Sequence, residues 1–281
     1  GLNWPIEKIE KPEVGKGTSS LGIGSKQTLA AQPVMYNHLE DAMQAKCEND
    51  DPAWTALLAS FLQTSGCLRL GHIIRRSVPV ERYDGWVLFF CKRGKQKHNR
   101  QGFYWGAPSR TSSGWDWATP FLELYKTKRE STKGEALMGA IFRTDDFEHF
   151  TPRAVNIITQ AAMQEVVDNP QLLGTYSWRR YLPTIALAIG CSKEERLALG
   201  DWQDKELIKE VAPITLRYAE GKAGLSRQIK VKLARVQTFL RERGTAKFDD
   251  ITEVEWKSMW LNSQGLEQGA VATTVLWRNP D

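Results

Sequence analysis

Apolar residues recur at helical spacing along most of this chain, and this pattern limits the fold more than any other feature. One stripe, which follows the start signal Asp51-Pro52, consists of Trp54, Leu57, Leu58, Phe61 and Leu62. Further stripes follow Thr151-Pro152, run from Trp178 to Ile189 past an early Pro183, and cover 226–243. Ser192 with Glu195 forms a capping-box signal for another helix. Apolar residues on one face at a period of 3.6 predict a mainly α-helical protein.

Two short runs break this helical pattern and predict strands: Trp86–Cys91 and Gly102–Trp105. The segment between them carries five cations, namely Lys92, Arg93, Lys95, Lys97 and Arg100. We therefore expect a small antiparallel β-hairpin sheet with a basic tip. The polar stretch from Ser109 to about Lys133 is predicted to be irregular.

The chain divides into three parts by pattern. Residues 1–28 are rich in Gly, Ser, Lys and Pro and are predicted to be a linker or tail. Residues 29–222 form the predicted main domain, and 223–281 a C-terminal helical tail. The tail's stripe of Ile229, Leu233, Val236 and Leu240 must be buried, either in its own domain or in a groove of a second protomer. We expect the second arrangement on DNA, with a monomer in free solution.

Composition narrows the class of partner. A net charge of +5, with 41% hydrophobic and 25% charged residues, is typical of a soluble globular protein and favours a polyanionic partner. No apolar run approaches the roughly 20 residues of a membrane span, and the N-terminus does not resemble a signal peptide. The four cysteines, Cys47, Cys67, Cys91 and Cys191, lack metal-site spacing and are predicted to be reduced thiols of an intracellular protein.

Several residues with chemical potential occur in a fixed order. Gly66-Cys67-Leu68-Arg69 follows a helix break, and Tyr176-Ser177-Trp178-Arg179-Arg180 opens an apolar helix. Leu199-Gly200-Asp201-Trp202 and Leu216-Arg217-Tyr218 come later. Together with the basic hairpin, this ordered set resembles the catalytic domain of the tyrosine recombinases over about residues 30–222. Alone, each residue is more often structural or simply exposed.

The resemblance implies a role for each residue. Arg69 and Arg179 would bind the non-bridging phosphate oxygens, with Tyr176 and Trp202 as further donors, and Tyr218 would be the nucleophile. Lys95 or Lys92 would protonate the leaving oxygen; the sequence does not separate the two. Arg93, Lys97, Arg100 and Arg180 would contact DNA. The expected partners are double-stranded DNA and other copies of the chain on DNA, with no membrane, metal or small-molecule cofactor.

The chain also departs from the family pattern. Tyr176 stands where the family has histidine, and His72 stands where an acidic residue is common. Residues 203–210 look like an insertion before Tyr218, and nothing before residue 28 could form the family's DNA-clamping domain. Such divergent forms look most like recombinases of eukaryotic mobile elements, which implies the nucleus, or otherwise the cytoplasm. A type IB topoisomerase is a near neighbour in chemistry. An inactive, domesticated DNA-binding protein and a helical scaffold for another protein remain as alternatives.

Overall fold

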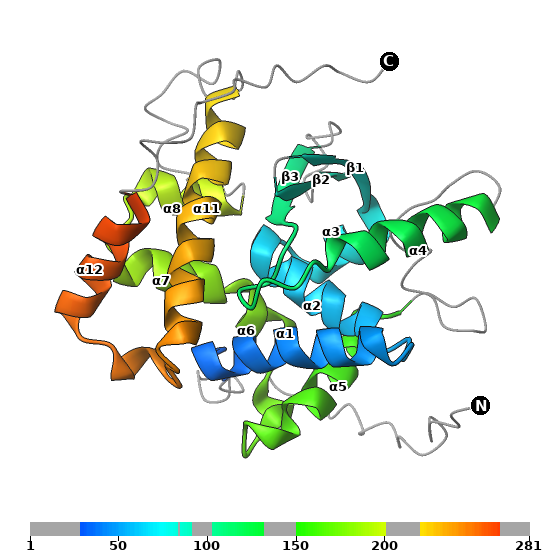
Figure 1. Ribbon diagram of the computed structural model, residues 1–281, viewed down its shortest axis with the longest axis horizontal. Coiled ribbons are helices and arrows are strands. Elements are labelled where there is room, and N and C mark those ends of the chain that lie inside the picture. Colours follow the sequence, from blue (N-terminus) through cyan, green and yellow to red (C-terminus); the bar gives the residue numbers. More distant parts are fainter. Residues whose placement is uncertain (1–28, 84, 92–102, 132–149, 201–219, 265–281) are drawn as a thin grey trace, which may run out of the picture.

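A fully buried helix, α2, lies at the centre of the structure, a computed structural model that describes residues 29–83, 85–91, 103–131, 150–200 and 220–264 (Figure 1). Helix α2 runs over Trp54–Gly66, and all of its residues are buried. It contacts α1 (Pro33–Glu48), α3 (Leu70–Arg76) and several later elements. The predicted apolar stripe is confirmed, and the helix is enclosed on its other faces as well.

The sheet has three antiparallel strands in the order β1-β2-β3: Ser77–Tyr83, Trp86–Cys91 and Phe103–Pro108. The predicted pairing of the last two is confirmed, since Cys91 lies opposite Phe103. Phe89 and Trp105 stack with ring centroids 4.2 Å apart on the buried face. The sequence analysis missed β1, because Pro79 interrupts it and its residues from Val80 to Tyr83 are exposed, so no alternating pattern arises.

Helix α4 (Ala118–Ser131) shows that the prediction of an irregular segment over 109–133 was wrong for this part. The Asp116 carboxylate accepts hydrogen bonds from the backbone N–H groups of Ala118 (3.1 Å) and Thr119 (3.3 Å), which starts the helix. Trp117 and Phe121 are fully buried there, and the Trp117 ring lies edge-on to Phe61, with centroids 5.6 Å apart. Because the outer face of this helix is polar and few of its residues are apolar, the sequence shows no clear helical stripe.

The middle of the chain forms short helices whose start signals are confirmed. They are α5 (Pro152–Ala162), the 3-10 turns Met163–Glu165 and Pro170–Leu172, α6 (Thr175–Arg179), α7 (Tyr181–Ala188) and α8 (Lys193–Leu199). Thr151 Oγ1 accepts from Ala154 N at 3.1 Å, and Ser192 and Glu195 form the reciprocal capping box. The stripe from Trp178 to Ile189 is divided between α6 and α7.

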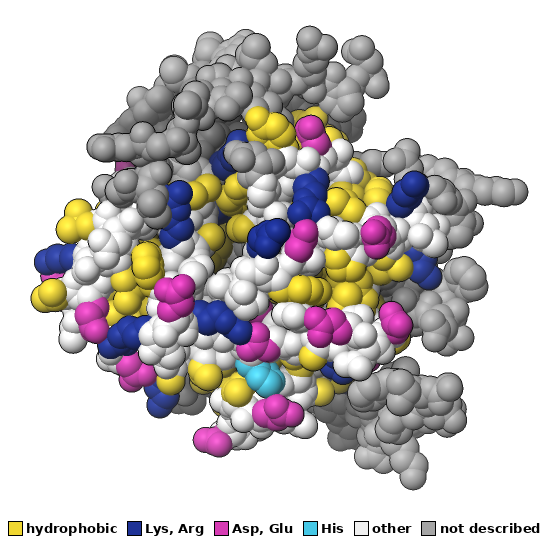
Figure 2. Space-filling view, in the orientation of Figure 1, with side chains coloured by type: hydrophobic (Ala, Val, Ile, Leu, Met, Phe, Trp, Pro, Cys, Tyr) yellow, Lys and Arg dark blue, Asp and Glu magenta, His cyan; other side chains and the backbone are white. Residues whose placement is uncertain are grey.

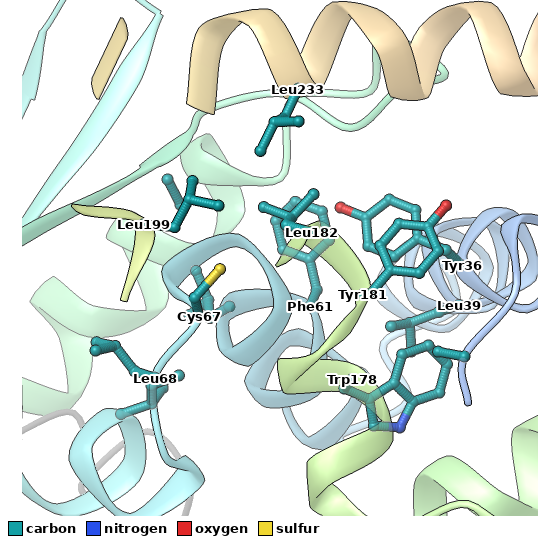
Figure 3. Close-up of a cluster of buried hydrophobic side chains, with 14 of the residues drawn as sticks. Tyr36, Leu39, Phe61, Cys67, Leu68, Trp178, Tyr181, Leu182, Leu199 and Leu233 are labelled. Carbon is teal, nitrogen blue, oxygen red and sulfur yellow. The ribbon is translucent and has the colours of Figure 1, made fainter. Parts of the chain in front are cut away.

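Helix α11 (Glu220–Glu242) belongs to the same core as the helices before it. Ile229, Leu233, Val236 and Leu240 are at most 1% exposed. In Figure 3, Leu233 points toward the cluster that contains Leu182 and Tyr181 of α7 and Phe61 of α2. The expectation that this stripe docks onto a second protomer is therefore wrong: its own domain lies closest and already buries it. The 3-10 turn Phe248–Asp250 and α12 (Glu253–Gln264) follow.

Three further observations concern the cysteines, the length of the helices and the grouping of polar side chains. All four cysteines are free thiols, three of them buried, as the sequence predicts. Within the described ranges, no helix has both the length and the apolar character to cross a membrane. The same segments contain no group of His, Cys, Asp or Glu side chains arranged to hold a metal ion. The result is a mainly helical protein with one small antiparallel sheet.

Candidate functional site

The turn between α2 and α3 places the first predicted site residue, Arg69. Gly66 ends α2 at a point where an added Cβ would lie only 3.0 Å from the Trp105 ring, so a side chain there would require the ring to shift slightly. Cys67 then adopts the left-handed conformation, with φ 52°, which is uncommon for a residue other than glycine. The chain turns sharply, and the half-buried Arg69 becomes the N-cap residue of α3.

Arg179 reaches the same turn from the end of α6. Its Nε donates a hydrogen bond of 2.9 Å to the backbone carbonyl of Cys67, although 112 residues separate the two. Partial burial lowers the pKa of Arg179, and the positive charge of Arg69 lowers it further. Arg69 and Arg179 therefore lie near enough for their charges to interact, which agrees with the direction of the expectation; whether both reach one phosphate stays a prediction. We call this place the arginine corner, defined by Arg69, His72, Arg76 and Arg179.

His72 lies within the arginine corner. Burial lowers its pKa to about 4, and the positive charges of Arg76, Arg69 and Arg179 act in the same direction. The imidazole is therefore neutral at neutral pH, and its ring lies edge-on to Phe103, with centroids 6.0 Å apart. Its Nδ1 is buried and finds no hydrogen-bond partner within the described part of the chain.

Arg76 is a member of the corner that the sequence analysis missed. Arg69, His72 and Arg76 are spaced i, i+3 and i+7, which is the spacing of one helix face. That signal was present in the sequence, but the short helix α3 offered too few residues to read a face from it.

Tyr176 and Arg180 flank Arg179 on α6. Tyr176 is one helical turn before Arg179 and is half exposed, so its hydroxyl is accessible to an incoming ligand. The guanidinium of Arg180 lies over the Tyr176 ring, 5.9 Å from its centroid. Arg180 is exposed between α6 and α7. These two residues extend the polar surface beside the arginine corner.

The remaining predicted site residues lie outside the described residues. They are Lys92, Arg93, Lys95, Lys97 and Arg100 of the basic segment, and Trp202 and Tyr218. Strands β2 and β3 end on either side of the basic segment, and α8 and α11 border 201–219. The roles assigned to all of these residues stay predictions.

The face drawn in Figure 2 carries charges of both signs. On the face drawn in Figure 2, Lys and Arg side chains are interspersed with Asp and Glu, so the net charge of +5 is not gathered there. A site formed by several guanidiniums, one neutral imidazole and an accessible phenol offers many hydrogen-bond donors. This donor set suits a phosphate or another oxyanion.

No family model, curated protein or solved structure matches this chain. Its function has to be argued from its own residues and their geometry.

Proposed function

We propose that this chain is a tyrosine recombinase that cuts and rejoins duplex DNA through a 3′-phosphotyrosine intermediate. The observation that carries the proposal is the proximity of Arg69 and Arg179, two arginines of separate motifs that lie 110 residues apart in the sequence. Like charges that lie close together repel one another. Their convergence is useful if an anion binds between them.

The proposed reaction uses the predicted residues as follows. The Tyr218 hydroxyl gives up its proton to solvent or to a neighbouring base, and its oxygen attacks the phosphorus. The bond from phosphorus to the 5′-oxygen breaks, and Lys95 or Lys92 donates a proton to that oxygen. Arg69 and Arg179 hold the non-bridging oxygens, whose negative charge grows in the transition state. Attack by the 5′-hydroxyl on the phosphotyrosine then reverses these steps and releases the tyrosine.

The fold supports the proposal at a second point. The basic segment connects two paired strands, β2 and β3, and β3 packs against α2, the helix that leads into Arg69. The sheet and the arginine corner are thus parts of one core. Such a scaffold suits a site in which a hairpin lysine and two arginines act on one phosphate. We infer the integrase-like catalytic architecture from this arrangement.

A nicked suicide substrate tests the proposal. Cleavage close to the nick lets the short 5′-product diffuse away, so an active recombinase stays covalently attached to the DNA. We expect the wild-type chain to form this adduct and Tyr218→Phe to form none while still binding duplex DNA. Tyr83→Phe is the matched control, since Tyr83 is an exposed tyrosine of β1. An undiminished adduct with Tyr218→Phe would remove the proposed nucleophile.

Tyr176 favours one alternative, an inactive DNA-binding descendant of the same fold. A phenol donates a hydrogen bond to phosphate but is a poorer proton shuttle than the imidazole it replaces. Salt-sensitive DNA binding without any adduct in the wild-type chain would select this alternative. Absence of both binding and adduct would leave the helical scaffold.

A further inference from the structure

A cavity of about 240 Å³ is lined by none of the residues that define the arginine corner. It is open to solvent on one side and is lined by α1, α2, α7, α11, Trp86 of β2 and the segment that follows β3. Figure 1 shows α11 crossing beside α1 with this segment between them. Phe61, Trp86 and Leu182 supply apolar wall, and the volume is somewhat below that of a pocket for a drug-sized ligand.

Three cations line this cavity: the buried Lys230, the half-buried Arg235 and the exposed Arg110. Each donates to a backbone carbonyl: Lys230 Nζ to Gly106 O (3.2 Å), Arg235 Nη1 to Ser263 O (2.8 Å) and Arg110 Nη1 to Gly114 O (3.1 Å). None of the three forms an ion pair with a carboxylate of the described segments. A buried cation without an opposite charge is costly, and burial accordingly lowers the pKa of Lys230.

The acidic groups nearby do not supply the missing charge. The Cys67 thiol interacts electrostatically with Lys230, but burial raises its pKa to about 11, so the thiol is neutral. Glu40 also lines the cavity, but its carboxylate already accepts hydrogen bonds from Ser112 N (3.0 Å) and Ser112 Oγ and pairs with Arg241 at 3.4 Å. The cavity therefore has apolar walls and an excess of positive charge.

We propose that this cavity binds a small aromatic monoanion, of the class of the aromatic carboxylates, whose charge pairs with Lys230. The apolar walls would cover the ring, and the anion would supply the counter-charge that Lys230 lacks. Arg235 and Arg110, which are progressively more exposed, would attract the anion toward the interior. This site is independent of the proposed DNA chemistry.

Three ligands of nearly equal shape and different charge test the proposal: benzoate, benzamide and benzamidine. Their dissociation constants are measured on the full chain, without DNA, from backbone amide chemical shifts. We expect benzoate to bind at least about tenfold more tightly than benzamide, because a charged pair stabilises the complex by more than one neutral hydrogen bond. Benzamidine should bind weakest. The shifts should centre on Lys230, Ala234 and Thr111, which line the cavity.

Lys230→Met should lower benzoate affinity to the level of benzamide and leave benzamide binding unchanged. Lys232→Met is the matched control on the same helix, because the Lys232 amine lies 5.2 Å from the Trp260 ring centroid and Lys232 does not line the cavity. Should Lys230→Met fail to fold, the exposed Arg110→Gln replaces it and should weaken benzoate binding severalfold. Equal affinities for benzoate and benzamide, a preference for benzamidine, no saturable benzoate binding at millimolar concentration, or undiminished binding by the folded cavity variants would each overturn the proposal.

Discussion

Two titratable groups, the partly buried His72 and the buried Glu40, respond to burial in opposite ways. Burial is the largest effect on both, and it lowers the pKa of His72 to about 4 while raising that of Glu40 to about 7. Around His72 the nearby guanidiniums add to the effect of burial. Around Glu40 the hydrogen bonds from Ser112 and the charge of Arg241 oppose it. The charges near His72 thus act in the same direction as burial, whereas the groups around Glu40 act against burial without cancelling it.

This difference separates a structural cluster from a candidate binding site. The Glu40 cluster, defined by Glu40, Ser112, Arg241 and Asp41, joins α1, α11 and the segment after β3 through its own ion pairs. Under the proposed function, a phosphate bound at the arginine corner would interact favourably with more than one guanidinium at once.

The largest expected difference between the arginine corner and the Glu40 cluster is in the rate of DNA cleavage. Arg69→Ala should reduce the rate of covalent adduct formation by about 10² to 10³-fold, because one preorganised donor to the transition state is lost. Arg241→Ala, in the Glu40 cluster, should leave the rate per folded molecule unchanged. Rates are measured with the nicked substrate after thermal melts have shown the folded fraction. A similar loss of rate in both variants would mean that the two corners do not differ in function.

The next largest effect is on the free energy of unfolding and tests the raised pKa of Glu40. Its pKa is higher in the folded chain than the usual 4.5, so the folded state binds more protons between about pH 4.5 and 7, and stability falls as pH rises through this window. The expected contribution is about 3 kcal/mol, at 1.36 kcal/mol per pKa unit. Glu40→Gln should remove this slope, as measured by urea unfolding at several pH values. An unchanged slope would show that Glu40 stays ionised in the fold.

The smallest effect concerns His72 and has the opposite sign. Its folded pKa lies below the usual 6.5, so the unfolded chain binds more protons between about pH 4 and 6.5, and stability rises with pH there. Because His72 is only partly buried, solvent screens this contribution. In an NMR titration, its imidazole should stay neutral down to about pH 5. Adding duplex DNA should raise its pKa, since phosphate offsets the nearby guanidiniums; a value insensitive to DNA would place the phosphate elsewhere.

Much of the secondary structure could be predicted from signals between residues close together in the sequence. Helix starts at Thr151 and Ser192 depend on neighbouring residues, and the structure confirms both. The stripe on α2 and the pairing of β2 with β3 are confirmed for the same reason. Helix α4 was missed because only a few of its residues face the core, and β1 because its outer half is exposed.

Candidate site residues could be identified from the sequence only where they belong to a short motif. Arg69 and Arg179 were identified from a helix break and a Tyr-x-x-Arg spacing, and in the structure they lie near enough for their charges to interact. Nothing local marks Glu40 as buried or Lys230 as part of a cavity. Those properties arise from contacts between α1 and α11, about 200 residues apart, which no short-range pattern encodes. The burial of the α11 stripe in its own domain has the same origin.

The contacts between α1 and residues 237–248 also have a consequence during synthesis of the chain. Val34 N donates to Ala246 O at 3.3 Å, Phe248 N donates to the Gln32 side chain at 3.0 Å, and Gln237 donates to Asn37 at 2.8 Å. At about 5–20 residues per second, a ribosome needs roughly 10–40 s to make the intervening 200 residues. During that interval the side of α1 that will face α11 has no partner from its own chain. We therefore expect the nascent chain to need chaperones, or rapid folding once α11 has been made, to reach the native structure.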